Sequence, residues 1–374
     1  MPSIATHYIF SQDTALKLSS SSHVISTTIK NALGAYNAGA QGPDIFFYDI
    51  MHLAIAGKPN NIGSHMHVKK TDIFFMNYIK EIFKQNCYSS TAVRAYLMGF
   101  LTHYSLDTCI HPYVYSVTTV AGNSKKAVKT SLNAHCQLES DIDELLYYER
   151  FHNTINYADR NDFFNINDEQ IKEIAPVLSA AINKTYGCNI SASYIVGTFK
   201  RAKFTDNLLQ DTSGLKKKIF APLEKWITGS NTGSSLIFNT ELPDRTCLNE
   251  EHRVWRVPAT GKLCTDSFYE MYDKAIKRAI HLITKYNSCL NDIYELCIVN
   301  DNNISDAGSG NNDMINKYSN IHNTKALTSA IFSNPNLAIS QLANDFVKTF
   351  GHDTKGLSYH TGINWRLGSY LYNQ

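Results

Sequence analysis

Apolar residues recur at helical spacing along most of the chain. In the segment 72–83, for example, apolar side chains repeat every three or four residues, as they do on one face of an α-helix. Strand-like alternation is scarce, and the sequence has no internal repeat. We expect helices over residues 23–40, 72–83, 90–111, 125–148, 168–182, 190–202, 215–226, 267–299 and 324–350. The pattern therefore predicts an all-α fold.

Breaks in this pattern divide the chain. Gln41-Gly42-Pro43 is a turn signal after the first of these helices. Pro112 disfavours α geometry in the residue before it, so we expect the helix that carries His103 to stop near Ile110 or His111. Residues 300–323 are rich in Asn, Asp, Gly and Ser, a composition typical of a polar loop. We predict one domain over residues 1–229 and a mainly helical extension over residues 230–374.

Composition limits the class of protein. A formal charge of +2 gives no electrostatic reason to expect binding to nucleic acid. No run of about 18 apolar residues appears, so no transmembrane segment is expected, although peripheral membrane contact stays open. The start of the chain shows no secretory signal, and the eight cysteines are scattered, as in proteins with reduced thiols. We expect a cytoplasmic protein, with secretion by another route left open.

The candidate chemistry lies in two helical motifs. His103-x3-Asp107-x3-His111 and His135-x3-Glu139 both place their residues four apart. Residues at this spacing share one face of a helix, so two adjacent helices would direct all five side chains to one point. Imidazoles and carboxylates are the ligands that Zn²⁺ prefers. The motifs therefore predict a metal site and metal-assisted hydrolysis.

Further segments offer more ligands than one tetrahedral ion needs. They supply His7, Asp44 and either His65 or His67. Two or three ions that share a carboxylate would use this number, with Asp107 as the bridge. Each motif alone is more often a polar helix surface or loop, and it is their joint occurrence within about 135 residues that argues for a site.

A resemblance to a known family supports this interpretation. The segment from Tyr96 to Tyr113, YLMGFLTHYSLDTCIHPY, resembles the core signature of the bacterial zinc-dependent phospholipase C family, whose catalytic domain occurs in alpha-toxins. The opening residues up to His7, the turn at Asp44 and the His135-x3-Glu139 motif follow in that family's order. The resemblance covers roughly residues 1–200. It implies a multi-helix bundle of the phospholipase C and zinc-nuclease type.

The resemblance also implies a set of zinc ligands. One ion would be held by Asp44, His67, His103 and Asp107, a second by His111, His135 and Glu139, and a third by His7 and Asp107. The family's glycine-containing loop favours His67 over His65. The family completes the third site with an N-terminal tryptophan, and this sequence has none near its start. Two or three Zn²⁺ ions are therefore expected.

The implied reaction is phospholipase C cleavage of a glycerophospholipid to diacylglycerol and a phosphorylated head group. Asp44 is the candidate to orient or deprotonate the attacking water, and the substrate would be a phospholipid or another phosphodiester. Two alternatives stay open, a nuclease that cuts single-stranded nucleic acid and an inactive zinc-binding protein of the same fold. His360 is expected to be a residue of a C-terminal loop.

Overall fold

Helices build most of the described structure. The computed structural model describes residues 4–48, 62–120, 129–130, 132–229, 231, 233–305, 357–362 and 364. Its α-helices are α1 (Ile4–Ser19), α2 (His23–Asn31), α3 (Leu33–Ala40), α5 (Ile62–Val68), α6 (Thr71–Lys84), α7 (Thr91–Thr118), α8 (Leu132–Phe151), α9 (Asp168–Tyr186), α10 (Ala192–Leu209), α11 (Leu215–Thr228) and α12 (Phe268–Ser305). The predicted all-α fold is confirmed.

Short elements join these helices. The 3-10 helices are η1 (Gly42–Phe46), η2 (Ile155–Tyr157), η3 (Arg160–Asp162), η4 (Ser234–Leu236) and η5 (Arg245–Leu248). Two antiparallel pairs of two-residue strands complete the described elements, β1 (Thr119–Val120) with β2 (Lys129–Thr130), and β3 (Trp255–Arg256) with β4 (Leu263–Cys264).

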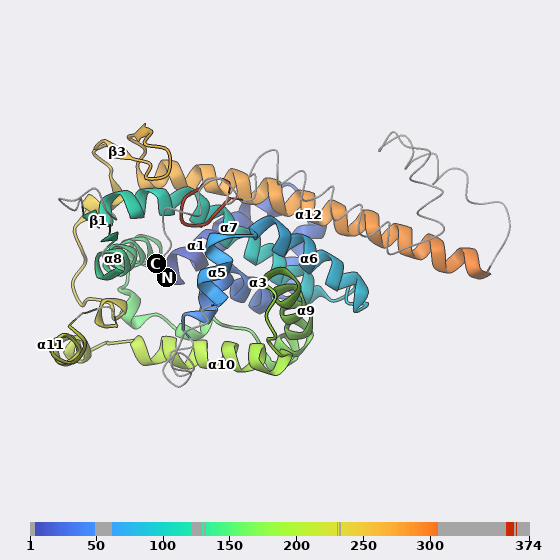
Figure 1. The fold of residues 1–374 in the computed structure, drawn as a ribbon, viewed down its shortest axis with the longest axis horizontal. Coiled ribbons are helices and arrows are strands. Elements are labelled where there is room, and N and C mark those ends of the chain that lie inside the picture. The colour runs from blue at the N-terminus through green and yellow to red at the C-terminus, as the bar shows by residue number, and fades with distance from the viewer. Residues whose placement is uncertain are drawn as a thin grey trace.

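Helix α7 is the central helix of the fold, and the other elements pack around it (Figure 1). It crosses α3 so closely that a Cβ atom on Gly99 would lie 2.0 Å from the carbonyl oxygen of Tyr36. A Cβ atom on Gly39 would likewise lie 2.1 Å from the carbonyl oxygen of Tyr96. Only glycine permits this approach of two helix backbones, and it fixes α7 against the turn that carries Asp44.

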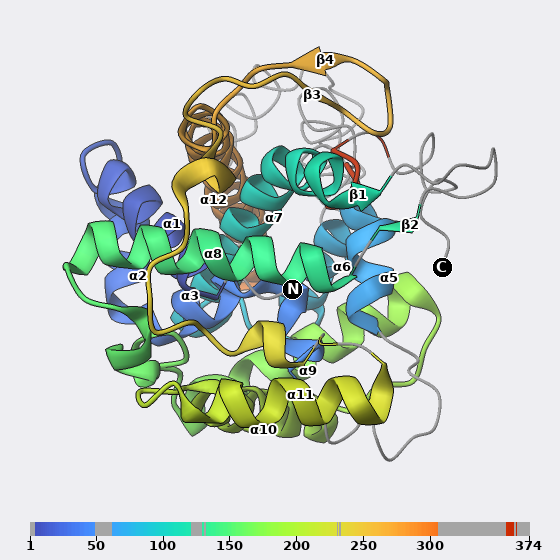
Figure 2. The same ribbon diagram turned by 90° about the vertical axis from the view of Figure 1, so that its left-hand side faces the viewer.

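Two hydrophobic clusters stabilise the arrangement, and α7 contributes to both. One contains Phe100 and Leu101 of α7 together with α3, α6 and α9, and the other contains Leu106 and Val114 of α7 together with α8 and α12. Figure 2 shows α8 beside α7 and α1, with α10 and α11 below it. The polar residues of α7 that face away from these clusters lie where α1, α5 and α8 meet.

Several helix boundaries differ from the sequence-based expectation. The helix expected from residue 125 begins at Leu132, and Lys129–Thr130 within the expected range form strand β2. The helix expected over residues 23–40 breaks at Ala32, whose φ is −137°, and continues as α3. After the break, Gly34 and Gly39 both press against backbone carbonyls of other segments, so packing determines the direction of α3.

The expected stop before Pro112 is wrong, because α7 continues to Thr118. Proline removes one N–H from the helix, the one that would bond the carbonyl oxygen of Thr108. Tyr113 and Val114 are buried beyond the proline, and their burial favours continuation of the helix. The sequence rule was outweighed by tertiary packing.

The described C-terminal part contains one long helix, α12, after the short elements η4, η5, β3 and β4. Helix α12 packs along α7 and runs to Ser305, so residues 300–305 of the expected polar loop are helical. The rest of that loop and the helix expected over residues 324–350 lie outside the described residues, and the domain boundary at residue 229 stays a prediction. Among the described helices, none has the length and apolar character needed to cross a membrane.

Candidate metal centre

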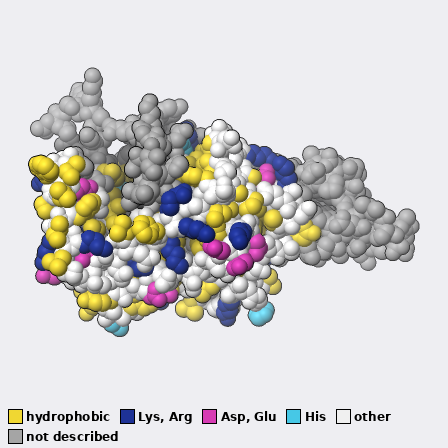
Figure 3. All heavy atoms as spheres, turned by 90° about the horizontal axis from the view of Figure 1, so that it is seen from below, with side chains coloured by type: hydrophobic (Ala, Val, Ile, Leu, Met, Phe, Trp, Pro, Cys, Tyr) yellow, Lys and Arg dark blue, Asp and Glu magenta, His cyan; other side chains and the backbone are white. Residues whose placement is uncertain are grey.

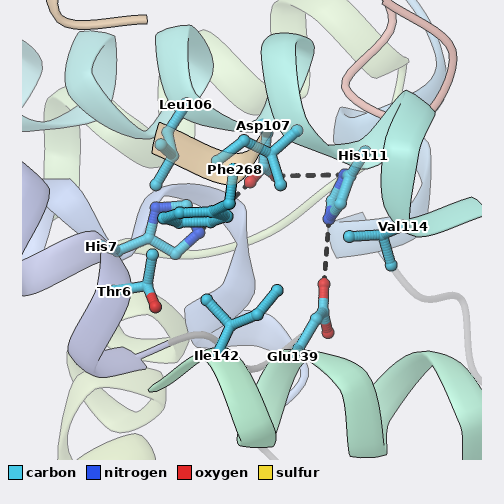
Figure 4. Close-up of a pocket in the computed structure, with 10 residues that line it drawn as sticks. Thr6, His7, Leu106, Asp107, His111, Val114, Glu139, Ile142 and Phe268 are labelled. Atoms are coloured by element: carbon cyan, nitrogen blue, oxygen red, sulfur yellow. Dashed lines mark hydrogen bonds and ion pairs between the residues drawn. The ribbon is translucent and has the colours of Figure 1, made fainter. Parts of the chain in front are cut away.

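The two motifs predicted to share a point do so. On α7, Asp107 Oδ2 lies 3.2 Å from His103 Nε2 and 3.5 Å from His111 Nδ1. On α8, Glu139 Oε1 lies 3.1 Å from His135 Nε2, and it lies 3.1 Å from His111 Nε2 across the helix interface. All five side chains are buried. Figure 4 shows Asp107, His111 and Glu139 directed toward one another from α7 and α8.

Three residues from earlier segments join this group. His7 of α1 places Nε2 3.3 Å from Asp107 Oδ1. His67 of α5 places Nε2 3.0 Å from Oδ1 of Asp44, which lies in η1. His67 is buried and His65 is exposed, so of the two alternatives it is His67 that lies at the centre.

The eight predicted residues form three buried clusters. They are His7 with His103 and Asp107, Asp44 with His67 and His103, and His111 with His135 and Glu139. Two ligand atoms on one tetrahedral zinc, each about 2.1 Å from the ion, lie roughly 3.4 Å apart. The contacts of 3.0–3.3 Å within these clusters match that spacing. Their role as ligands stays a prediction.

Buried polar atoms that lack hydrogen bonds also fit metal binding. His67 Nε2, His103 Nε2 and Asp107 Oδ2 have no hydrogen-bond partner in the described part of the chain. Burying such atoms without a partner is costly, and a bound cation removes that cost. The donor set of imidazoles and carboxylates is the one zinc takes in hydrolytic sites.

Backbone carbonyls orient three of the imidazoles. The Nδ1 atoms of His67 and His103 lie 2.7 Å from the Gly63 carbonyl oxygen and 3.2 Å from the Ala40 carbonyl oxygen, respectively. His111 Nδ1 lies 3.1 Å from the carbonyl oxygen of Tyr359. A histidine that donates through Nδ1 presents Nε2 to a metal, and such partners fix the tautomer and the ring plane.

The N-terminal turn of α1 is held by a carboxylate of α8. Asp143 accepts hydrogen bonds from the backbone N–H groups of Ala5 and Thr6, at 3.1 and 2.8 Å. These groups have no partner within a helix, so the carboxylate caps α1 and anchors His7 next to Asp107. Sequence reasoning missed Asp143, although it lies on the face of α8 that also carries Glu139.

Electrostatics favour the ionised carboxylates that metal binding needs, and Asp107 and Glu139 in turn raise the pKa of His111 against the effect of its burial. Burial alone would raise the pKa of the Asp107 carboxyl, but His111, His103 and His7 hold that pKa well below its usual value. Burial likewise opposes ionisation of Glu139, and His135 and His111 hold its pKa well below the ordinary range. Burial lowers the pKa of His103 to about 4. Ionised carboxylates beside a neutral imidazole are ready to bind a cation.

A small cavity opens behind the centre. His7, Asp107, His111 and Glu139 line it together with apolar side chains such as Leu106, Ile142 and Phe268 (Figure 4). The apolar side chains reduce the local dielectric constant, which strengthens the electrostatic interactions of the ligands.

A match to a known protein family agrees with this geometry. Residues 6–187 match the family model described as zinc dependent phospholipase C. This segment is a zinc-dependent phospholipase C domain. It contains all eight predicted site residues, from His7 to Glu139. No curated protein and no solved structure matches the chain.

Residues outside the phospholipase C domain also reach the centre. Tyr359 and His360 lie beside His67, with ring centroids 5.1 and 5.4 Å from its ring centroid. His360 does belong to a turn, but its place at the centre was missed. No spacing rule could have found it, since 221 positions separate Glu139 from His360 (360 − 139).

Proposed function

We propose that this protein is a zinc-dependent phosphodiesterase that cleaves a glycerophospholipid to diacylglycerol and a phosphorylated head group. The observation that carries the proposal is the set of three buried clusters, linked through His103 and Asp107, within a zinc-dependent phospholipase C domain. Linked clusters fit two or three ions that act on one phosphate, and a single structural zinc would need only four ligands.

The proposal assigns the ligands as follows. Asp44, His67, His103 and Asp107 would hold one ion, His111, His135 and Glu139 a second, and His7 with Asp107 a third. When bound, zinc supplies a water of lowered pKa and neutralises charge on the phosphate. The side chains fix where that charge develops, because each is buried and three of the imidazoles are held by backbone carbonyls.

Asp44 is the proposed base. Burial would raise the pKa of its carboxyl, but nearby positive charges, those of the His67 and His103 imidazoles among them, hold that pKa below its usual value. The carboxylate is therefore ionised at neutral pH and can accept a proton from the attacking water on one of its oxygens. The water oxygen forms a new bond to phosphorus as the bond from phosphorus to the glycerol oxygen breaks. The proton taken up by Asp44 can then pass to that oxygen, which leaves as an alcohol.

The experiment compares substrates on the purified, zinc-loaded chain. Phosphatidylcholine should release diacylglycerol and phosphocholine, identified by mass spectrometry. Single-stranded DNA, the substrate of the nuclease alternative, should stay intact. Cleavage of DNA without cleavage of lipid would overturn the assignment in favour of a nuclease, and zinc binding without turnover of either would favour an inactive zinc-binding protein.

Peripheral membrane contact is part of this proposal, and helix α11 is the surface that supports it. None of its described side chains is buried, and Trp226 is 82% exposed. Leu215, Ile219 and Trp226 lie within about 40° of one another around the helix axis. Figure 3 shows hydrophobic and basic side chains together on the face that contains α10 and α11.

The basic residues beside this surface indicate which partner would bind to it. Lys218 and Lys225 lie beside the apolar stripe of α11, an arrangement typical of helices that lie in the interface of an anionic membrane. We therefore propose an anionic phospholipid surface as the partner. The inner leaflet of a cell membrane is anionic, in keeping with the cytoplasmic location that we retain as a proposal.

The contact is tested by replacing apolar residues of α11. The double variant Ile219→Ser, Trp226→Ser should bind vesicles of phosphatidylserine and phosphatidylcholine at least about fivefold more weakly in a sedimentation assay, because it removes most of the inserted apolar area. Leu16→Ser is the matched control, since Leu16 of α1 is exposed to a similar degree as Ile219. Unchanged vesicle binding, or a dimer in light scattering that only the double variant dissociates, would contradict a membrane role.

A further inference from the structure

The segment Leu357–Gly362 is bound to the metal centre by several hydrogen bonds. The N–H of Tyr359 donates to the carbonyl oxygen of His67 at 2.9 Å, and the N–H of Leu357 donates to the hydroxyl oxygen of Tyr104 at 2.9 Å. Thr71 Oγ1 donates to the Leu357 carbonyl oxygen at 3.0 Å. The segment therefore has a defined position against α5, α6 and α7.

The side chain of Tyr359 fixes this segment further. Its ring is 1% exposed, and its centroid lies 5.2 Å from that of Tyr104 and 5.5 Å from that of His103. The carbonyl of the same residue holds His111 Nδ1 at 3.1 Å. One residue of the C-terminal part thus contacts side chains of two different ligand clusters.

The next residue, His360, lies over the same two clusters. Its ring centroid is 5.4 Å from that of His67 and 5.7 Å from that of His111. These separations resemble the 5.6 Å between His111 and His135, which share a cluster. His360 itself belongs to none of the three clusters, and it is only half-buried, whereas the ligand histidines are buried.

This position would place the His360 side chain in contact with a bound substrate. A phosphodiester that spans the clusters of His67 and His111 must pass the ring lying beside both. An imidazole donates a hydrogen bond from at least one ring nitrogen in either protonation state, and anionic phosphate oxygens are strong acceptors. The ring of Tyr115 also lies beside His360, with its centroid 5.2 Å from that of the imidazole.

We propose that His360 contacts the phosphate group of the substrate and that the segment Leu357–Gly362 completes the catalytic centre of the phospholipase C domain. The proposal rests on phosphodiester hydrolysis at this centre. It gives a function to a part of the chain that lies beyond the matched residues 6–187.

The test uses inorganic phosphate as the probe and needs no turnover. In the zinc-loaded protein, His360→Ala should weaken phosphate binding about tenfold to hundredfold in isothermal titration calorimetry, the loss expected for one charge-assisted hydrogen bond. Zinc content, measured by elemental mass spectrometry, should not change. His360→Asn should recover part of the affinity, because its amide is also a donor. His23→Ala, at an exposed histidine of α2, is the control.

Each other outcome overturns the proposal. Loss of zinc in His360→Ala would make His360 a metal ligand, and unchanged phosphate affinity would remove it from the substrate site. A rise in kcat/KM on phosphatidylcholine would mean that the segment obstructs the substrate. Failure of the proposed function would be recognised separately. A wild-type protein that binds zinc and phosphate but cleaves no phosphodiester would contradict the proposed function, and its phosphate affinity would still test the role of His360.

Discussion

At the scale of single residues, one buried ion pair lies apart from the metal centre. Arg160 Nη2 lies 3.4 Å from Asp206 Oδ1, and both side chains are at most 2% exposed. The guanidinium also faces the rings of Phe163 and Phe238, at 5.4 and 5.1 Å from their centroids. Burial raises the pKa of the Asp206 carboxyl to about 6, while Arg160 lowers it. The pair joins η3 to α10.

Removing one partner should be costly. Asp206→Ala leaves a buried guanidinium without its counter-charge, so we expect the free energy of unfolding to fall by about 3–5 kcal/mol in urea denaturation. Asp168→Ala is the control, because Asp168 pairs with Lys200 at the surface and the expected loss is below about 1 kcal/mol. Equal losses in the two variants would mean that burial of the Arg160 pair has no energetic consequence.

The residues of the metal centre were predictable to different degrees. His103, Asp107 and His111 could be placed together because residues four apart share a helix face whatever the rest of the fold does. The partners that orient them could not be predicted, since the Ala40 and Tyr359 carbonyls belong to segments brought together only by packing. The type of a residue does not indicate which side chain its backbone carbonyl will contact.

At the scale of elements, the segment Leu357–Gly362 depends on a glycine where it crosses α7. Gly362 has a φ of +62°, and a Cβ atom there would lie 2.7 Å from the Thr108 carbonyl oxygen and 2.9 Å from Pro112 Cγ. This is the carbonyl that Pro112 deprives of its helical hydrogen bond. The proline that failed to end α7 thus lies where the C-terminal segment packs against that helix.

Gly362→Ala should therefore displace the segment. Because His111 would lose the Tyr359 carbonyl, we expect zinc affinity at the cluster of His111 to fall at least about tenfold, measured by competition with a chelator. Gly187→Ala is a matched control, since Gly187 also has a positive φ of 70° but a Cβ atom there would meet nothing within 4 Å. Equal zinc affinity in the two variants would contradict a supporting role for the segment.

Among the elements, the long periodic helices followed from the sequence and the departures had tertiary causes. The break at Ala32 and the continuation of α7 beyond Pro112 both arise where other segments press on the helix. Local preferences in the sequence are worth only a few kcal/mol, and packing contacts of this kind outweigh them.

At the scale of the whole molecule, the metal centre connects parts that are far apart in the sequence. Asp143 of α8 holds the start of α1, Tyr359 holds His111 of α7, and the Gly63 carbonyl orients His67 of α5. Bound metal should therefore stabilise the arrangement of these elements as well as the ligands themselves. These contacts support a phospholipase C domain whose metal centre is completed by the C-terminal part of the chain.

Metal content of the purified chain, measured by elemental mass spectrometry, tests this account most directly. We predict two or three zinc ions per wild-type chain, in keeping with the three clusters. Glu139→Gln should lose one zinc and most phosphodiesterase activity while its circular dichroism stays unchanged, because only the cluster of His111 and His135 loses its carboxylate. A wild-type chain without zinc, or a Glu139→Gln variant with undiminished zinc and full activity, would contradict it.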